Sequence, residues 1–190
     1  MKHTSLIALG SVLIIGSVNV QAGDDWTWFA GMKDGYTAQP AVSLMFGMLD
    51  PDVDGADSDA ITGIELSLNC PMLQPPTNRI RQQISYAKYD KSGVELTSIE
   101  ANPHYVIETS PGLELGFGPG VGYVMAKSEG SVGGVDDGAF ALQLGASAHY
   151  TGMGPLFIGA EARYQMTTDF DGIDDNINNF RVALKVGYSF

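Results

Sequence analysis

The stretch NFRVALKVGYSF, residues 179–190, ends the chain and alternates between two kinds of side chain. Every second residue from Phe180 to Phe190 is apolar or aromatic, whereas the residues between them are charged, amide or small, Arg181 and Lys185 among them. A period of two is typical of a β-strand with one apolar and one polar face. The stretch therefore predicts a strand that runs to the last residue.

The same alternation recurs upstream, in segments of similar or greater length. Strands of about 9–11 residues are long enough for a tilted crossing of a membrane. Strands of soluble proteins are most often about five to six residues long. We predict eight strands, in chain order Ala41–Leu49, Ala60–Asn69, Arg79–Tyr89, Gly93–Glu108, Leu113–Met125, Phe140–Tyr150, Leu156–Met166 and Phe180–Phe190.

The connections between these segments alternate in length. The long and acidic ones are Asp50–Asp59, Lys127–Asp137 and Thr168–Ile177, and the tight ones are Thr109–Gly112 and Thr151–Gly154. Membrane barrels have an even number of strands, short periplasmic turns and longer extracellular loops. With eight strands the long connections share one side, where the short turn Asp90–Gly93 is the fourth. We therefore expect an all-β fold, an eight-stranded antiparallel up-and-down transmembrane β-barrel, that forms one domain over residues 23–190.

Two segments fit this scheme less well. Asn69–Asn78, with three prolines, is long for a periplasmic turn. Trp26–Met32 also alternates, so that a ninth strand is possible in principle. Because bacterial single-chain barrels have even strand numbers, we prefer an N-terminal extension or a broken first strand for Trp26–Met32.

Residues 1–22 have the features of a secretory signal peptide. Lys2 and His3 precede an apolar core, Leu6–Val18, and Val20-Gln21-Ala22 fits the small-x-small cleavage pattern. The apolar core, at about 13 residues, is too short to span a membrane as a helix. We expect cleavage after Ala22 and a mature chain in the bacterial outer membrane.

Charge and cysteine content exclude several classes of function. Without Lys2 the mature chain has nine basic and 22 acidic residues. Neutralising phosphates requires Lys and Arg, so we expect no nucleic-acid partner. The single cysteine, Cys70, allows neither an internal disulfide nor a Cys/His metal site.

Charged side chains fall on the face that points into the predicted barrel. In hydrocarbon the sheet must close on itself and turn its apolar face outward, which leaves the inner face for polar groups. In a soluble sandwich, the alternative, the same residues would lie on the solvated face. We predict a polar network in the lumen made of Glu65, Arg81, Glu100, His104, Glu114, Glu161, Arg163, Arg181 and Lys185. Isolated charges there are costly to desolvate, so we expect them to pair.

The ending Val186-Gly187-Tyr188-Ser189-Phe190 resembles the C-terminal strand signature of outer-membrane porins and small barrels. The whole mature chain resembles the small OmpA/OmpX-type outer-membrane β-barrel superfamily. The resemblance implies that Phe190 and Tyr188 form an assembly signal read by the barrel-assembly machinery. It also implies outer-membrane lipid and lipopolysaccharide as surroundings of the folded chain.

Some eight-stranded barrels modify lipid A, so the polar residues of this chain could include a catalytic group. A lipid deacylase of that kind has a His-x-Ser-Asn constellation, whereas this chain has Ser147-Ala148-His149 in the opposite order. His104 with Glu100 is a second candidate pair, but a packed polar lumen explains it better. We expect no catalysis and no cofactor.

The acidic connection that begins at Asp50 matches the opening of a calcium loop through Asp50, Asp52 and Asp54. The twelfth position is Ile61, where an EF-hand needs a bidentate glutamate. We weigh three interpretations: a solvated acidic loop, which we favour, a weak divalent-cation site, and a cation bridge to lipopolysaccharide phosphates.

The predicted lumen is narrow. Gly116, Gly118, Gly120 and Gly122 share one face, but strand glycines usually permit close approach rather than a channel, and about eight strands leave room only for side chains. We therefore expect a monomer with a plugged lumen and a structural or interaction role, presenting acidic extracellular loops. The alternatives are a narrow pore for small solutes and, third, a lipid A-modifying enzyme.

Overall fold

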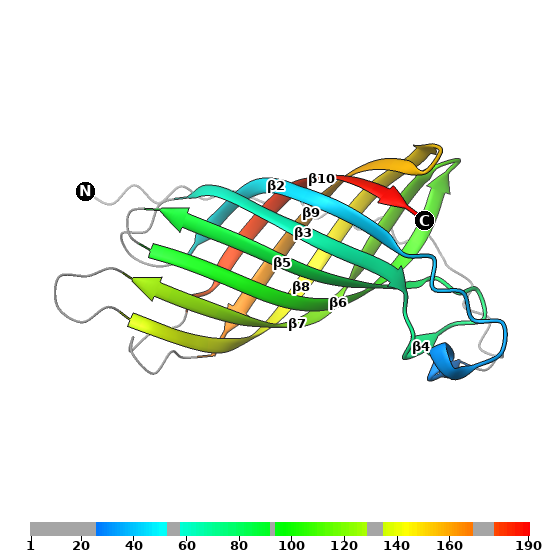
Figure 1. The fold of residues 1–190 in the computed structure, drawn as a ribbon, viewed down its shortest axis with the longest axis horizontal. Helices are drawn as coiled ribbons and strands as arrows, with labels where there is room; N and C mark the ends of the chain where they lie inside the picture. The colour runs from blue at the N-terminus through cyan, green and yellow to red at the C-terminus, as the bar shows by residue number, and fades with distance from the viewer. Residues whose placement is uncertain (1–25, 53–57, 92–93, 129–134, 169–176) are drawn as a thin grey trace.

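The computed structural model describes residues 26–52, 58–91, 94–128, 135–168 and 177–190. Eight strands close into an antiparallel barrel, so the predicted fold class is confirmed (Figure 1). In chain order the barrel strands are β2 (Ala41–Pro51), β3 (Asp59–Asn69), β5 (Ile80–Lys91), β6 (Val94–Ser110), β7 (Leu113–Ser128), β8 (Val135–Met153), β9 (Leu156–Thr167) and β10 (Asn179–Ser189).

Closure joins the last strand to the first. β10 pairs with β2 in continuous register, from Asn179 opposite Pro51 to Ser189 opposite Ala41. On its other side β10 pairs with β9. The backbone groups of both edges are therefore paired within the chain, which is what hydrocarbon requires of a sheet.

The barrel is inside-out relative to a soluble protein. On β10, Leu184 exposes 65% of its surface, whereas its neighbour Lys185 exposes 1%. Outward aromatic residues lie toward both ends of the wall, for example Tyr164 and Phe180 toward one end and Tyr150 and Tyr188 toward the other. Such rows are typical of the interfacial girdles of membrane barrels.

Several strand ends differ from the prediction. β7 continues to Ser128 and β8 begins at Val135, inside the predicted loop Lys127–Asp137. At the opposite end, only residues 111–112 and 154–155 lie between the paired strands of the two tight hairpins. The hydrogen bonds between strands join backbone groups and do not require apolar side chains. Strand pairing therefore continues beyond the point where the alternation of apolar and polar residues ends.

The two ends of the barrel differ. Residues 52–58, 92–93, 129–134 and 168–178 connect strands at one end, which we call the loop end. The tight turns, the C-terminus and a small N-terminal substructure lie at the other, the turn end (Figure 1). Residues 1–25 lie outside the described part of the chain, and with them the predicted signal peptide.

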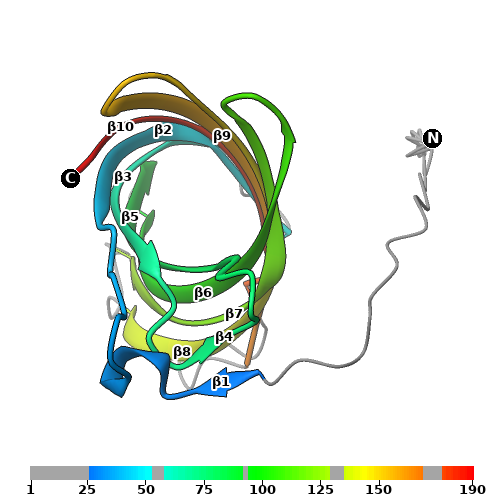
Figure 2. The same cartoon turned by 90° about the vertical axis from the view of Figure 1, so that its right-hand side faces the viewer.

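The small substructure unites the two segments that did not fit. Thr27–Trp28 (β1) pairs with Leu73–Gln74 (β4), and a 3-10 helix, Ala30–Met32 (η1), follows β1. Trp26–Met32 is thus an extension and not a ninth barrel strand, and β4 lies within the long turn Asn69–Asn78. We call residues 26–39 and 70–79 the cap. The two ribbon views place it beside the barrel wall at the turn end (Figures 1 and 2). Among the described residues, no helix is long and apolar enough to cross a membrane.

Candidate functional site in the barrel interior

Six charged side chains meet in the middle of the barrel. Three are acidic and three are basic, and all six are buried: Glu65, Glu100, Glu161, Arg163, Arg181 and Lys185. They come from strands β3, β6, β9 and β10, and strand alternation points each of them inward. We call this balanced set the charged tier.

Glu161 is the centre of the charged tier, because it contacts all three cations. Arg163 Nη2 and Lys185 Nζ both donate to its Oε2 at 2.6 Å. Arg181 Nη2 lies 3.3 Å from its Oε1. Lys185 Nζ also donates to Glu65 at 2.7 Å, which ties β10 to β3 across the intervening β2.

Glu100 closes the network from the far side of the lumen. Arg181 donates to its two oxygens at 3.0 and 2.8 Å, in a two-pronged contact. Arg163 Nη1 and the Ser85 hydroxyl also donate to Glu100. Because β6 is not a neighbour of β9 or β10 in the sheet, these bonds cross the interior and hold opposite walls together.

An amide tier lies beside the charged tier. Asn179 donates to Gln165 at 2.9 Å, Gln165 to Gln143 at 2.9 Å, and Gln143 to Asn102 at 2.5 Å. The chain of bonds runs from β10 through β9 and β8 to β6. The hydrogen bond between Gln143 and Asn102 requires glycine at position 120 of β7, because a Cβ there would collide with Asn102 Oδ1. The glycine face of β7 is thus space for polar side chains of other strands.

His104 forms a separate contact. Its Nδ1 lies 3.2 Å from Ser147 Oγ, and the histidine is 0% exposed. Glu100, the partner proposed for His104 from the sequence, instead binds the two arginines. Gly116 and Gly145 border the imidazole so closely that a Cβ at either would touch it. His104 is therefore packed within the lumen with no room for a substrate beside it.

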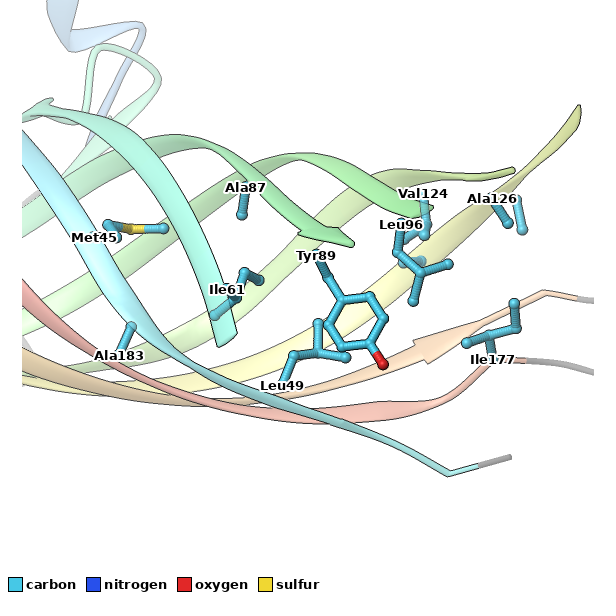
Figure 3. Packing of buried hydrophobic residues seen from close by; sticks show 12 residues of the cluster. Met45, Leu49, Ile61, Ala87, Tyr89, Leu96, Val124, Ala126, Ile177 and Ala183 are labelled. Atoms are coloured by element: carbon cyan, nitrogen blue, oxygen red, sulfur yellow. The ribbon is translucent and has the colours of Figure 1, made fainter. Parts of the chain in front are cut away.

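Apolar side chains line the lumen mainly toward the loop end (Figure 3), although Met45 and Ala183 lie level with the charged tier, opposite Lys185 and Glu161 in the strand register. Leu49, Tyr89 and Val124 each stand within a few residues of a loop-end connection. Together with residues of four other strands and with Ile177, they form one buried cluster, the apolar tier: Met45, Leu49, Ile61, Ala87, Tyr89, Leu96, Val124, Ala126, Ala139, Ala141, Ile177 and Ala183. The inward face is therefore polar in the middle of the barrel and apolar near the loops.

Arg81 and Glu114 are not part of the charged tier. They border a cavity of about 330 Å³ at the turn end, together with His149 and Phe190. Arg81 donates to Ser67 Oγ and to the Gln39 carbonyl, both at 3.0 Å. The predicted set of nine lumen residues thus divides into a central six, the packed His104 and a pair at the turn end.

The acidic loop residues give no metal centre within the described residues. Asp50 accepts a hydrogen bond from Ser58 at 2.6 Å, Asp52 is exposed, and Asp54 lies outside the described residues. Over the described ranges, no group of three or more His, Cys, Asp or Glu side chains is placed to hold a metal ion.

The C-terminal aromatics lie at the turn end. Phe190 donates its backbone N–H to the Pro40 carbonyl at 2.9 Å, which continues the pairing of β10 with β2. The rings of Tyr188 and Phe190 meet edge to face, with centroids 5.1 Å apart. Both side chains are exposed.

Sequence reasoning missed the amide tier and the apolar tier. The amides carry a signal, since Asn102, Gln143 and Gln165 alternate in step with the inward charges. The apolar tier has a weaker one: alternation of polarity fades near the loop ends, where both faces are apolar or small.

Comparison with known proteins gives a likeness of structure alone. No protein-family model and no curated protein sequence matches the chain. Among solved structures, neisserial surface protein A superposes with a TM-score of 0.60 at 13% identity, over 88% of this chain and 100% of that one. The attachment invasion locus protein Ail of Yersinia pestis gives 0.57 at 16%, over 82% and 100%. The N-terminal β-barrel domain of Pseudomonas aeruginosa OprF gives 0.54 at 16%, over 81% and 100%.

These values establish a shared fold. The chain is similar to these barrels over 81–88% of its length, and its outer wall is apolar as that of a membrane barrel must be. The fold predicted from the sequence, an eight-stranded outer-membrane barrel, is the fold that the structure and these comparisons show.

Proposed function

We propose that this outer-membrane β-barrel is a closed, non-catalytic scaffold that presents acidic loops at the cell surface. One observation carries the proposal: two chemically different tiers fill the lumen in succession. The charged tier joins opposite walls through ion pairs of 2.6–3.3 Å. The apolar tier covers it toward the loop end.

The tiers oppose the narrow-pore alternative for two separate reasons. An ion that crosses the charged tier must displace side chains that already satisfy one another's charge, and a buried charge left without its partner is strongly unfavourable. An ion in the apolar tier would lose most of its hydration, and apart from the Tyr89 hydroxyl the side chains of this tier are hydrocarbon or thioether groups that do not replace it. Each tier alone would therefore oppose the passage of an ion through the lumen.

Packing of the polar groups opposes the enzyme alternative. A general base must come within hydrogen-bond reach of its substrate. His104 is fully buried and borders glycines whose missing side chains leave it just enough room. A lipid A acyl chain outside the wall has no path to this histidine.

Solute uptake by vesicles tests the scaffold against the pore. Vesicles that contain the refolded barrel should swell in small sugars no faster than empty vesicles, and fast, size-dependent swelling would favour the pore. Mass analysis of lipopolysaccharide incubated with the barrel tests the enzyme, because loss or gain of an acyl chain would refute a non-catalytic role.

The acidic connections indicate which partners the scaffold would accept. Residues 50–59, 127–137 and 168–177 hold five, three and four acidic residues against the single Lys127. The similar protein Ail has been solved with the polyanionic heparin analogue sucrose octasulfate. An acidic surface repels such a ligand, so we propose a cationic partner or a cation-bridged one. Binding of oligolysine to the embedded barrel should weaken steeply with salt, and binding that is independent of salt would contradict this proposal.

Assembly is proposed to depend on the C-terminal aromatics. Phe190 and Tyr188 are exposed at the turn end, where the barrel-assembly machinery could read them before insertion of the monomer. Deletion of Phe190 should lower the amount of heat-modifiable, folded barrel in cells without lowering synthesis. Normal levels of folded barrel from the truncated chain would contradict this role.

A further inference from the structure

The cap leaves five large apolar side chains exposed. They are Trp26, Trp28, Phe29, Met32 and Met72, and Trp28 and Met32 expose 65% and 86% of their surface. Single exposed apolar residues are ordinary, whereas several gathered on one small element mark an interaction surface. Both tryptophans of the chain are among the five.

Exposure of these side chains is not the result of a loose backbone. Phe29 and Gly31 donate their N–H groups to the carbonyls of Met72 and Pro71, at 2.7 and 2.8 Å. Gln74 is buried and bonds Ile80 through both its amide nitrogen and its amide oxygen. The two arms of the cap are thus tied to each other and to the start of β5.

The backbone of Phe29 is left-handed, with φ 53° and ψ 47°. This conformation is unfavourable for a bulky residue and persists only where the surrounding structure enforces it. Here it directs the chain from β1 into η1 and leaves the aromatic ring in the open. Glycine or asparagine adopts this left-handed conformation with less strain than phenylalanine. A phenylalanine at this position is therefore unexpected if its ring simply faces water.

The cap begins where the lipid-facing wall ends. The carbonyl of Pro40, the residue after the first arm of the cap, accepts a hydrogen bond from the backbone N–H of Phe190. The Phe190 ring in turn meets the ring of Tyr188, on the outward wall, edge to face. The cap lies beside the wall at this end (Figures 1 and 2). The exposed aromatics of the cap therefore belong to an element that is joined to the barrel at the turn end, where the lipid-facing wall ends.

Chemistry of the cap matches the head-group region of a bilayer. Tryptophan is enriched at membrane interfaces because its ring is amphipathic. Within residues 26–39 and 70–79 the charged residues are only Lys33, Asp34 and Arg79, in contrast with the acidic loop-end connections. A surface poor in charge and rich in aromatics fits the head-group region of zwitterionic phospholipid.

We infer that the cap is a membrane anchor that inserts Trp26, Trp28 and Phe29 into the phospholipid head-group region beside the turn end of the barrel. The inference requires only that the barrel spans a membrane. It does not depend on whether the lumen is closed, so its test and that of the proposed function fail separately.

Tryptophan fluorescence tests the inference without any substitution, since all of the signal comes from the cap. The full chain is refolded into phosphatidylcholine vesicles, and its folding is checked by heat-modifiable migration. We expect emission at a shorter wavelength than that of tryptophan in water, and protection from acrylamide. Lipids brominated high on the acyl chain should quench the emission more than lipids brominated near the chain end. Bromine lies in both leaflets, so the direction of insertion does not affect the result.

Two outcomes would overturn the anchor. Emission typical of water, quenched by acrylamide and not by brominated lipid, would mean that the cap stands free. Emission quenched by neither agent would mean that protein, such as a second copy of the chain, covers the tryptophans. The single variants Trp26→Phe and Trp28→Phe keep an aromatic ring at each site and should each retain lipid quenching from the remaining tryptophan.

Discussion

The charged tier and the apolar tier fill the same lumen by opposite physics. Contacts of Glu161 with Arg163, Arg181 and Lys185 are directional, and each partner is needed because desolvation of an ion costs several kcal/mol. Contacts among Leu49, Ile61 and their neighbours are short-ranged and tolerate exchange of one apolar group for another. The charged tier therefore specifies which walls of the barrel meet, whereas the apolar tier fills space.

The charged tier connects strands that the sheet does not. Lys185 reaches from β10 to Glu65 of β3, and Arg163 and Arg181 reach Glu100 of β6. A slip of one residue in any of these strands would turn its charge toward lipid. The ion pairs of the charged tier therefore favour this register over a register shifted by one residue, and this contribution can be separated experimentally from that of packing.

The largest effect is expected from breaking the centre of the charged tier. Glu161→Ala leaves three buried cations with two carboxylates, so the free energy of unfolding should fall by about 3–5 kcal/mol. Urea titration of the barrel in vesicles measures it. Glu108→Ala, at an exposed position of β6, is the matched control and should change stability by less than about 0.5 kcal/mol. Equal losses from the two variants would remove the distinction between buried and exposed carboxylates.

A smaller effect is expected where the amide tier needs space. In Gly120→Ala the new methyl group meets Asn102 Oδ1 and Gln143 Cγ, and overpacking of this kind costs about 1–3 kcal/mol. Gly122→Ala, on the same face of β7, brings its methyl only to 3.2 Å from Glu100 Cγ and should cost less. The same urea titration ranks the two variants, and the reverse order would contradict the packing described for β7.

The smallest effect is expected in the apolar tier. Ile61→Val removes one methyl group from a buried cluster, for which about 0.5–1.5 kcal/mol is typical. Ile64→Val on the outward face of the same strand should change the free energy of unfolding less, because lipid fills the space. If Ile61→Val cost as much as Glu161→Ala, the two tiers would not differ in kind.

Alternation of side chains was sufficient to predict the closed barrel and the inward direction of Lys185, Arg181 and Glu161. It could not predict which charges pair, because pairing across the lumen depends on the stagger of all eight strands. Arg81 and Glu114 share the inward face with the central six but lie toward the turn end, a height that alternation does not encode.

The cap and the apolar tier could not be predicted, because each depends on residues that are far apart in the sequence. The cap pairs Trp28 with Leu73, and although Trp26–Met32 alternates, nothing in the sequence marks Leu73–Gln74 as its partner. The apolar tier was missed because Val124 and Ile177 lie where predicted strands were ending, so their inward direction could not be read from a repeating pattern.

Current recording in planar bilayers tests the central claim, that two independent tiers close the lumen. The unmodified barrel should show no stable conductance. Glu161→Ala should also stay closed, because Leu49 and Tyr89 still block the loop end, whereas the combination of Glu161→Ala with Leu49→Ala should leak. Large, stable conductance from the unmodified barrel would contradict the account.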